Sequence, residues 1–188
     1  MGGPKALLIV DGKPLVLHHV ERLREVDCRC VAVVVRPSSC EQVVRALQGI
    51  PGVVVIPAET TSAAASLAVG LRALTPSEAG AVLVTPVDLL PAGVSTLRAL
   101  LAACAVGHVR VATPRHAGRG GHPVVLRRAL VNRFLHGFSG TLRDLIGSAE
   151  AYRERVDVDD VAIHGDLDTP DDLAAIQSGD LPRFAGHA

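Results

Sequence analysis

The stretch AVLVTPVD, residues 81–88, decides the fold. Its first five residues are apolar and rich in β-branched side chains, which is typical of a buried strand. The strand is followed by Pro86, Val87 and Asp88. Because ligands of open α/β sheets bind beyond the carboxyl ends of strands, Asp88 stands where a binding site is expected. The alternative is that Asp88 caps the next helix or closes a turn.

Similar strands alternate with helical patterns along the first two thirds of the chain. Short apolar segments predict strands at 31–35, 53–56, 81–85 and 109–113. Apolar residues at helical spacing predict helices at 14–26, 39–47, 62–74 and 91–105. Strands and helices in this order form right-handed βαβ units on a mostly parallel sheet. We therefore predict an α/β fold, a Rossmann-like three-layer α/β/α sandwich.

The pattern changes after Pro114. A glycine-rich loop at 116–121 leads into an apolar run at 123–126, for which we predict an antiparallel strand. Two helices are expected after it, one through Phe134 and one at about 140–147. We predict one domain over residues 1–177 and a loose tail over 178–188.

Composition narrows the class of protein. The 188 residues include 19 Lys and Arg, 19 Asp and Glu, and no basic cluster, so neither a nucleic acid nor a membrane is expected as a partner. No apolar run is long enough to span a membrane, and no secretory signal begins the chain. We expect a cytoplasmic protein whose four cysteines are free and reduced, because they lack the spacing of a zinc site.

A cluster of acidic residues lies near the carboxyl end, at 166–172. Asp166 and Asp168 alternate, so on an extended segment their carboxylates would point to the same side and could bind Mg²⁺. The alternative is a solvated helix start capped by Asp168 or Thr169.

The glycine-rich stretch at 118–124 is the third candidate. Its glycines would let the backbone approach a ligand closely, Arg119 could meet a phosphate, and His122 would be held extended by Pro123. A flexible turn is the alternative. His18 and His19 fall in an amphipathic helix and are expected at the surface or the edge of the core.

Together, these segments resemble the MobA-like nucleotidyltransferases, in particular the branch that contains molybdenum-cofactor cytidylyltransferase. The segments that carry the resemblance are Gly2-Gly3-Pro4-Lys5, Gly12-Lys13-Pro14-Leu15, Ser66-Leu67, Gly70-Leu71, Pro86-Val87-Asp88, residues 118–123, and Asp166-Leu167-Asp168-Thr169-Pro170. The resemblance spans nearly the whole chain and implies a GT-A-like Rossmann sheet.

The resemblance also explains the opening residues, MGGPK. They match the end of a glycine-rich loop that in this family follows a first strand, and that strand and most of the loop are absent here. We expect a start assigned at an internal methionine, since a true deletion would uncover the backbone of an interior strand in a marginally stable domain. The chain without this segment is expected to bind nucleotide weakly or not at all.

The activity implied by the resemblance is transfer of a nucleoside monophosphate, CMP from CTP in preference to GTP, to the terminal phosphate of a molybdopterin-type acceptor, with release of pyrophosphate. Mg²⁺ is the implied cofactor, and a molybdenum enzyme is a possible partner. The implied site residues are Lys5, Asp88 and Asp168 for catalysis, Asp88 and Asp168 for the metal, Gly2, Gly3, Lys5, Ser66 and Asp88 for the nucleotide, and Arg119, Gly121, His122 and Arg143 for the acceptor.

The sequence departs from the family pattern at two places. Ala68 replaces the arginine of a Ser-Leu-Arg segment, and Ser139 stands where many relatives have an acidic residue. Three alternatives therefore stay open: guanylyl transfer, a different phosphorylated acceptor, and a non-catalytic module that binds nucleotide or matures a molybdenum enzyme.

Overall fold

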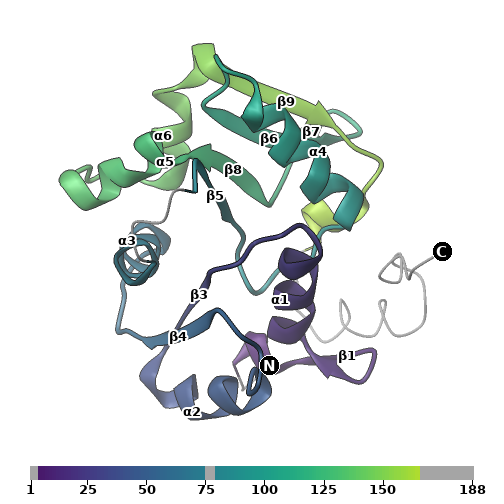
Figure 1. The fold of residues 1–188 in the computed structure, drawn as a ribbon, viewed down its shortest axis with the longest axis vertical. Coiled ribbons are helices and arrows are strands. Elements are labelled where there is room, and N and C mark those ends of the chain that lie inside the picture. The colour runs from purple at the N-terminus through teal and green to yellow at the C-terminus, as the bar shows by residue number, and fades with distance from the viewer. Residues whose placement is uncertain (1–3, 75–78, 166–188) are drawn as a thin grey trace.

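The computed structural model of the chain describes residues 4–74 and 79–165. Its strands form two sheets and a hairpin (Figure 1). In the first sheet, β3 (Val31–Val35) pairs in parallel with β4 (Val53–Pro57), with Val31 opposite Val53. The hairpin joins β1 (Ile9–Val10) to β2 (Lys13–Pro14).

The second sheet is built on β5 (Ala81–Val84), β8 (Val124–Arg127), β6 (Val111–His116) and β9 (Arg153–Asp157), with the short β7 (Arg119–Gly120) beside β6. Strand β8 pairs antiparallel with both β5 and β6, and β9 pairs in parallel with β6. Therefore β5, β6 and β9 share one direction. The mostly parallel sheet is confirmed, and so is the antiparallel strand predicted from the apolar run.

Helices cover both faces of the sheets, which confirms the three-layer prediction. One face carries α1 (Leu15–Glu25), α2 (Pro37–Ala46) and α4 (Val94–Ala105); their buried side chains pack with those of β3, β6 and β8. The opposite face carries α3 (Ala63–Ala73), α5 (Arg128–Val131), the 3₁₀ helix η2 (Asn132–His136) and α6 (Leu142–Gly147) over a second core.

Some boundaries differ from the predictions. Helix α4 begins at Val94, three residues after Pro91, because residues 91–93 continue the loop from β5. Strand β6 runs through Pro114 to His116, so the glycine-rich loop is a tight hairpin to β7. Three further 3₁₀ helices are η1 (Lys5–Leu7), η3 (Glu150–Tyr152) and η4 (Val161–His164).

The layer of strands is interrupted between β3 and β5. Within residues 4–74 and 79–165, no backbone ladder joins these two strands, although α3 contacts β3 and packs in one core with Val82 and Val84 of β5. All four residues of β5 are partly exposed, whereas Val125 and Leu126 of β8 are fully buried. We call this interruption the sheet break.

In the same described segments, no helix is both long and apolar enough to cross a membrane. All four cysteines are free thiols, as predicted. Cys104 is buried on α4, and this burial raises the pKa of its thiol.

Candidate functional site

The loop of residues 85–90 follows β5 and carries Asp88. Leu89 and Leu90 are buried, and Val87 packs against the core formed by α1, α2 and β3. The apolar neighbours hold the main chain in place, while the Asp88 side chain stays 50% exposed. A fixed backbone beneath an accessible carboxylate is a suitable geometry for binding a cation.

Lys5, near the start of the chain, lies close to Asp88. It lies on η1, and its Nζ is 4.0 Å from Asp88 Oδ2. Both side chains are substantially exposed, so this ion pair contributes little to stability. The structure thus brings together two of the predicted site residues, although they are more than eighty positions apart in the chain.

His19 supports the same loop from α1. Its Nε2 lies 2.9 Å from the carbonyl oxygen of Leu89, and a carbonyl can only accept, so Nε2 carries the proton and donates it. The side chain is buried, and desolvation lowers its pKa from 6.5 to about 4. His19 therefore lies deeper than the predicted surface or core edge, because it is on the face of α1 that buries Val16 and Val20.

Gly165, the last described residue, also holds the loop that carries Asp88. The backbone N–H of Leu90 donates to the carbonyl oxygen of Gly165, at 2.8 Å. Leu90 side-chain atoms lie so close to Gly165 that an added Cβ there would be 2.7 Å from one of them. Gly165, directly after η4, thus packs on the loop that carries Asp88.

The N-cap of helix α4 is Gly93 and not Asp88, and the side chain of Asp160, the N-cap of η4, bonds to this end of α4. Asp88 lies in a turn, which agrees with the other alternative. Asp160 Oδ2 accepts from Gly93 N at 2.8 Å and from Thr96 Oγ1 at 2.6 Å, and its Oδ1 accepts from Ala162 N. Sequence reasoning missed Asp160. The only signal was its place in the acidic run at 157–160, which resembles an ordinary polar loop.

Gly121 and His122 lie against η4. An added Cβ on Gly121 would be 2.2 Å from Ile163 O, and His122 N donates to the same oxygen at 3.0 Å. The bond from His122 to Pro123 is a cis peptide.

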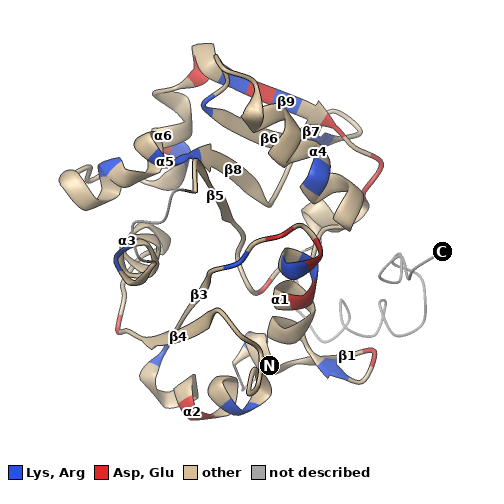
Figure 2. Ribbon diagram, viewed as in Figure 1, with Lys and Arg blue, Asp and Glu red and all other residues tan. Residues whose placement is uncertain are grey.

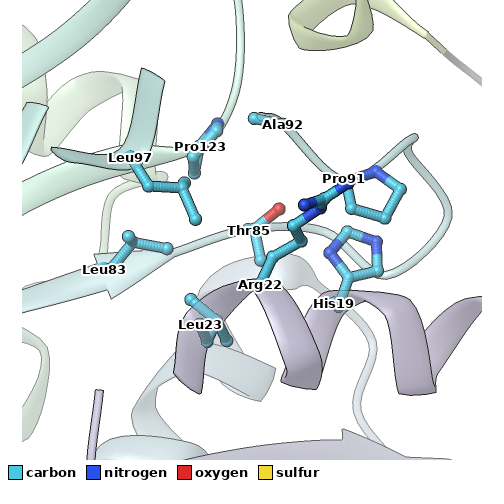
Figure 3. A pocket seen from close by; sticks show the side chains of 9 residues that line it. All are labelled: His19, Arg22, Leu23, Leu83, Thr85, Pro91, Ala92, Leu97 and Pro123. Carbon is cyan, nitrogen blue, oxygen red and sulfur yellow. The ribbon is translucent and has the colours of Figure 1, made fainter. Parts of the chain in front are cut away.

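A small pocket lies between α1, β5 and the start of α4 (Figure 3). Pro123 lines it together with Thr85, His19 and Arg22. Its volume of about 10 Å³ is close to that of one water, so the pocket does not hold a nucleotide.

The other predicted binding residues are spread over the molecule. Ser66 Oγ lies 2.6 Å from Thr60 Oγ1 at the start of α3. Arg119 is on β7 and Arg143 is on α6, and Figure 1 shows both elements well separated from the N-terminal segment that holds Lys5. Basic and acidic residues are interspersed along the described elements (Figure 2).

Gly2, Gly3 and Asp168 lie outside the described residues. Within the described part, no group of three or more His, Cys, Asp or Glu side chains could hold a metal ion. Asp88 fits as one oxygen ligand of a hard cation, because its carboxylate is accessible, but one carboxylate is not a complete donor set. The predicted second ligand, Asp168, is among the residues that the structure does not describe.

Comparison with known sequences places the chain in a family. The sequence pattern of the MobA-like NTP transferase domain matches residues 1–155. The chain belongs to the MobA-like NTP transferase domain family. This confirms the family resemblance and the class of nucleotidyltransferase, although not the molybdenum-cofactor branch. A search of curated protein sequences gave no match.

Solved structures share the fold of this MobA-like domain. Rv0371c from Mycobacterium tuberculosis H37Rv is 22% identical with a TM-score of 0.78, and the match covers 95% of this chain and 91% of that one. A structure of Rv0371c in complex with manganese is 24% identical with a TM-score of 0.70, covering 92% and 91%. The 4-diphosphocytidyl-2C-methyl-D-erythritol synthase from Anaerococcus prevotii is 12% identical with a TM-score of 0.75, covering 92% and 91%.

Proposed function

We propose that this chain transfers CMP from CTP to a phosphorylated pterin-type acceptor such as molybdopterin. An oxygen of the acceptor phosphate forms a bond to the α-phosphorus of CTP. The bond from that phosphorus to the oxygen bridging the β-phosphate breaks, and pyrophosphate leaves with the electron pair. The observation that carries the proposal is the approach of Lys5 to Asp88 beyond the carboxyl end of β5.

Charge explains why these two residues suit the reaction. Two anions that meet at 4 Å repel by about 1 kcal/mol in water and by about 4 kcal/mol at the effective dielectric of a protein surface. Lys5 would neutralise part of the triphosphate as a point charge, and Asp88 would hold Mg²⁺ beside it. Mg²⁺, when bound, supplies further positive charge to the phosphates.

We propose Asp168 as the second metal ligand. Gly165, the last described residue, bonds to Leu90, which follows Asp88 by two positions. Three residues span at most about 11 Å, so a carboxylate at position 168 is within reach of the same loop. Gly2 and Gly3 are proposed to bind the triphosphate, together with a preceding strand and loop of the family, and Ser66 to assist in binding the nucleotide.

Two structural neighbours support the choice of substrates. One is a synthase of a diphosphocytidyl compound, which favours CTP over GTP, and the other is a complex of Rv0371c with manganese, which favours a divalent cation. For the acceptor we propose Gly121, His122, Arg119 and Arg143. An ionised acceptor phosphate needs no general base, so His122 would act as a hydrogen-bond donor. We place the activity in the cytoplasm, with a molybdenum enzyme as the partner that receives the product.

The test is pyrophosphate release from CTP and from GTP, with Mg²⁺ and molybdopterin, by the chain carrying the family's first strand. Asp88→Asn and Asp88→Ala should abolish release while the melting temperature stays near that of the parent, because Asp88 is half-exposed and weakly paired. Asp11→Asn is the matched control, since Asp11 is an exposed carboxylate in the turn between β1 and β2.

Full activity of Asp88→Ala would refute the metal assignment. Binding of nucleotide by the parent with no release of pyrophosphate would favour the alternative of a non-catalytic module. A GTP rate above the CTP rate would overturn the choice of base.

A further inference from the structure

A second pocket lies where α1 ends and where β3 and β4 begin, and its volume is about 360 Å³. This volume is in the range of roughly 300 to 1,000 Å³ that is usual for small-molecule sites. The lining comes from the end of α1, the loop before β3 and the turn before β4: Arg24, Asp27, Cys28, Arg29, Pro51 and Gly52. It shares no residue with the Lys5–Asp88 pair or with the small pocket of Figure 3.

Close contacts join the two sides of this pocket. Val31 N donates to Gly52 O at 2.9 Å, and an added Cβ on Gly52 would be 2.2 Å from Arg29 O. Arg24 Nη1 donates to the same Arg29 oxygen at 3.2 Å, which places its guanidinium beside the turn before β4. The pocket is therefore preformed, and a ligand would not have to order it.

Asp27 occupies a position that usually belongs to glycine. Its N–H donates to Arg24 O, and Cys28 N donates to Leu23 O, which is the Schellman motif that ends a helix. The φ angle of Asp27 is +60°, in the left-handed region that favours glycine at this point of the motif. A carboxylate at the carboxyl end of a helix is also disfavoured by the helix dipole. Both effects lower stability, which indicates a use for the carboxylate other than ending α1.

The charges that line the pocket do not neutralise one another. Arg24, Asp27 and Arg29 are all exposed, and within residues 4–74 and 79–165 no ion pair involves any of the three. The carboxylate nevertheless acts on the pocket, because burial and, after it, the charge of Asp27 raise the pKa of the Cys28 thiol. The lining thus combines two cationic groups, one anionic group and a neutral thiol.

We propose that this pocket binds a small amino dicarboxylic acid, whose carboxylates pair with Arg24 and Arg29 and whose ammonium group pairs with Asp27. A guanidinium matches a carboxylate with two parallel N–H donors. Asp27 would repel a ligand with negative groups alone, and a ligand with a single carboxylate would leave one arginine without a partner. The loop between α1 and β3 carries charges of both signs (Figure 2), as such a ligand requires. The inference does not depend on the proposed function.

Isothermal titration calorimetry of the 188-residue chain with three probes tests the proposal. L-Glutamate carries all three charged groups, glutarate lacks the ammonium group, and γ-aminobutyrate lacks one carboxylate. Loss of one charge-assisted hydrogen bond weakens binding by about tenfold or more. L-Glutamate should therefore bind at least about tenfold more tightly than either of the other two probes.

Variants assign each charged group of the ligand to a residue. Asp27→Asn should remove the preference for L-glutamate over glutarate, because asparagine tolerates the left-handed backbone but carries no charge. Arg29→Gln should remove the preference over γ-aminobutyrate. Asp11→Asn is the matched control: Asp11 is also exposed, with φ +45°, but lies in the turn between β1 and β2, so both preferences should remain.

Asp27→Gly separates a binding role from a structural one. This variant should bind L-glutamate at least about tenfold more weakly than the parent and yet melt about 2 °C higher, because glycine relieves the backbone. A lower melting temperature would show that the fold, and not a ligand, requires Asp27.

Other results would also overturn the proposal. They are the absence of L-glutamate binding, equal affinities of the parent for L-glutamate and glutarate, and loss of both affinities by the same factor in Asp27→Asn. Tighter binding of inorganic phosphate than of L-glutamate would make the pocket a simple anion site.

Discussion

Protonation of His19 should destabilise the fold as the pH falls from 7 to 5. The side chain is 6% exposed, and burial lowers its pKa from 6.5 to about 4. A histidine with a depressed pKa is neutral in the native state and takes up a proton more readily when the chain unfolds. The unfolded state therefore binds more protons below pH 6.5, so stability falls as the pH falls through that value and levels off below about 4.

The size of the effect follows from the shift. Each pKa unit corresponds to about 1.4 kcal/mol, so the full loss is roughly 3 kcal/mol, of which about 2 kcal/mol falls between pH 7 and pH 5. Asp144, Glu150 and Asp157 do not obscure this window. Hydrogen bonds to Thr141, Arg155 and Arg115, respectively, lower the pKa of these carboxyls, so their contributions are lost only at more acidic pH.

Urea unfolding at pH 7, 6 and 5 measures the loss directly. In His19→Gln the amide can still donate to Leu89 O but does not titrate, so the loss between pH 7 and pH 5 should be smaller by about 2 kcal/mol than in the parent. Leu23→Ala, in the same pocket, is the control: it should lower stability at every pH and keep the parental slope. An equal slope in His19→Gln and the parent would refute the argument.

Two further predictions concern η4. Gly121→Ala should lower the free energy of unfolding by roughly 3 kcal/mol, because the new Cβ would be 2.2 Å from Ile163 O. Gly120→Ala is the control: its new Cβ would have its nearest atom at 3.9 Å, so stability should change by less than about 0.5 kcal/mol. Equal melting temperatures of the two variants would contradict this prediction. Asp160→Ala should cost about 2 kcal/mol because three hydrogen bonds are lost, whereas Asp159→Ala, at an exposed neighbour, should cost close to none. The same urea midpoint for both variants would show that the hydrogen bonds of Asp160 do not stabilise the fold.

Local sequence patterns were enough to predict the strands and helices, but they did not predict the contacts between residues that are distant in the sequence. The Val-rich runs at 31–35 and 81–84 predict the strands almost to the residue, because β-branched side chains favour the extended backbone of a strand. The predicted start of α4 is three residues early because Pro91 resembles a first-turn proline, whereas the N-cap is Gly93, whose N–H donates to Asp160, a residue distant in the sequence. No local pattern carries that information.

In the candidate site, too, contacts between distant residues could not be predicted from local patterns. The approach of Lys5 to Asp88 was foreseen only through the family resemblance, and nothing in the spacing of α1 marked His19 as the residue that holds Leu89. Buried hydrogen bonds to a main-chain carbonyl leave no trace in a single sequence, because any residue can supply the carbonyl.

In the loop beyond β5, the residues that hold the main chain in place differ from Asp88, the residue whose carboxylate would bind a cation. Three contacts distant in sequence, from His19, from Gly165 and from the core around Val87, hold its main chain. The carboxylate of Asp88 is half-exposed and, within residues 4–74 and 79–165, makes one weak ion pair. Changes at the anchors should therefore move the carboxylate and alter stability together, whereas changes at Asp88 should alter cation binding alone. A metal titration of His19→Ala, which removes the hydrogen bond to Leu89 O, against Asp88→Asn distinguishes the two: the first should weaken binding in parallel with a lower melting temperature, and the second without one. If His19→Ala lost stability and kept full metal affinity, the contacts that hold the loop would have no part in placing Asp88.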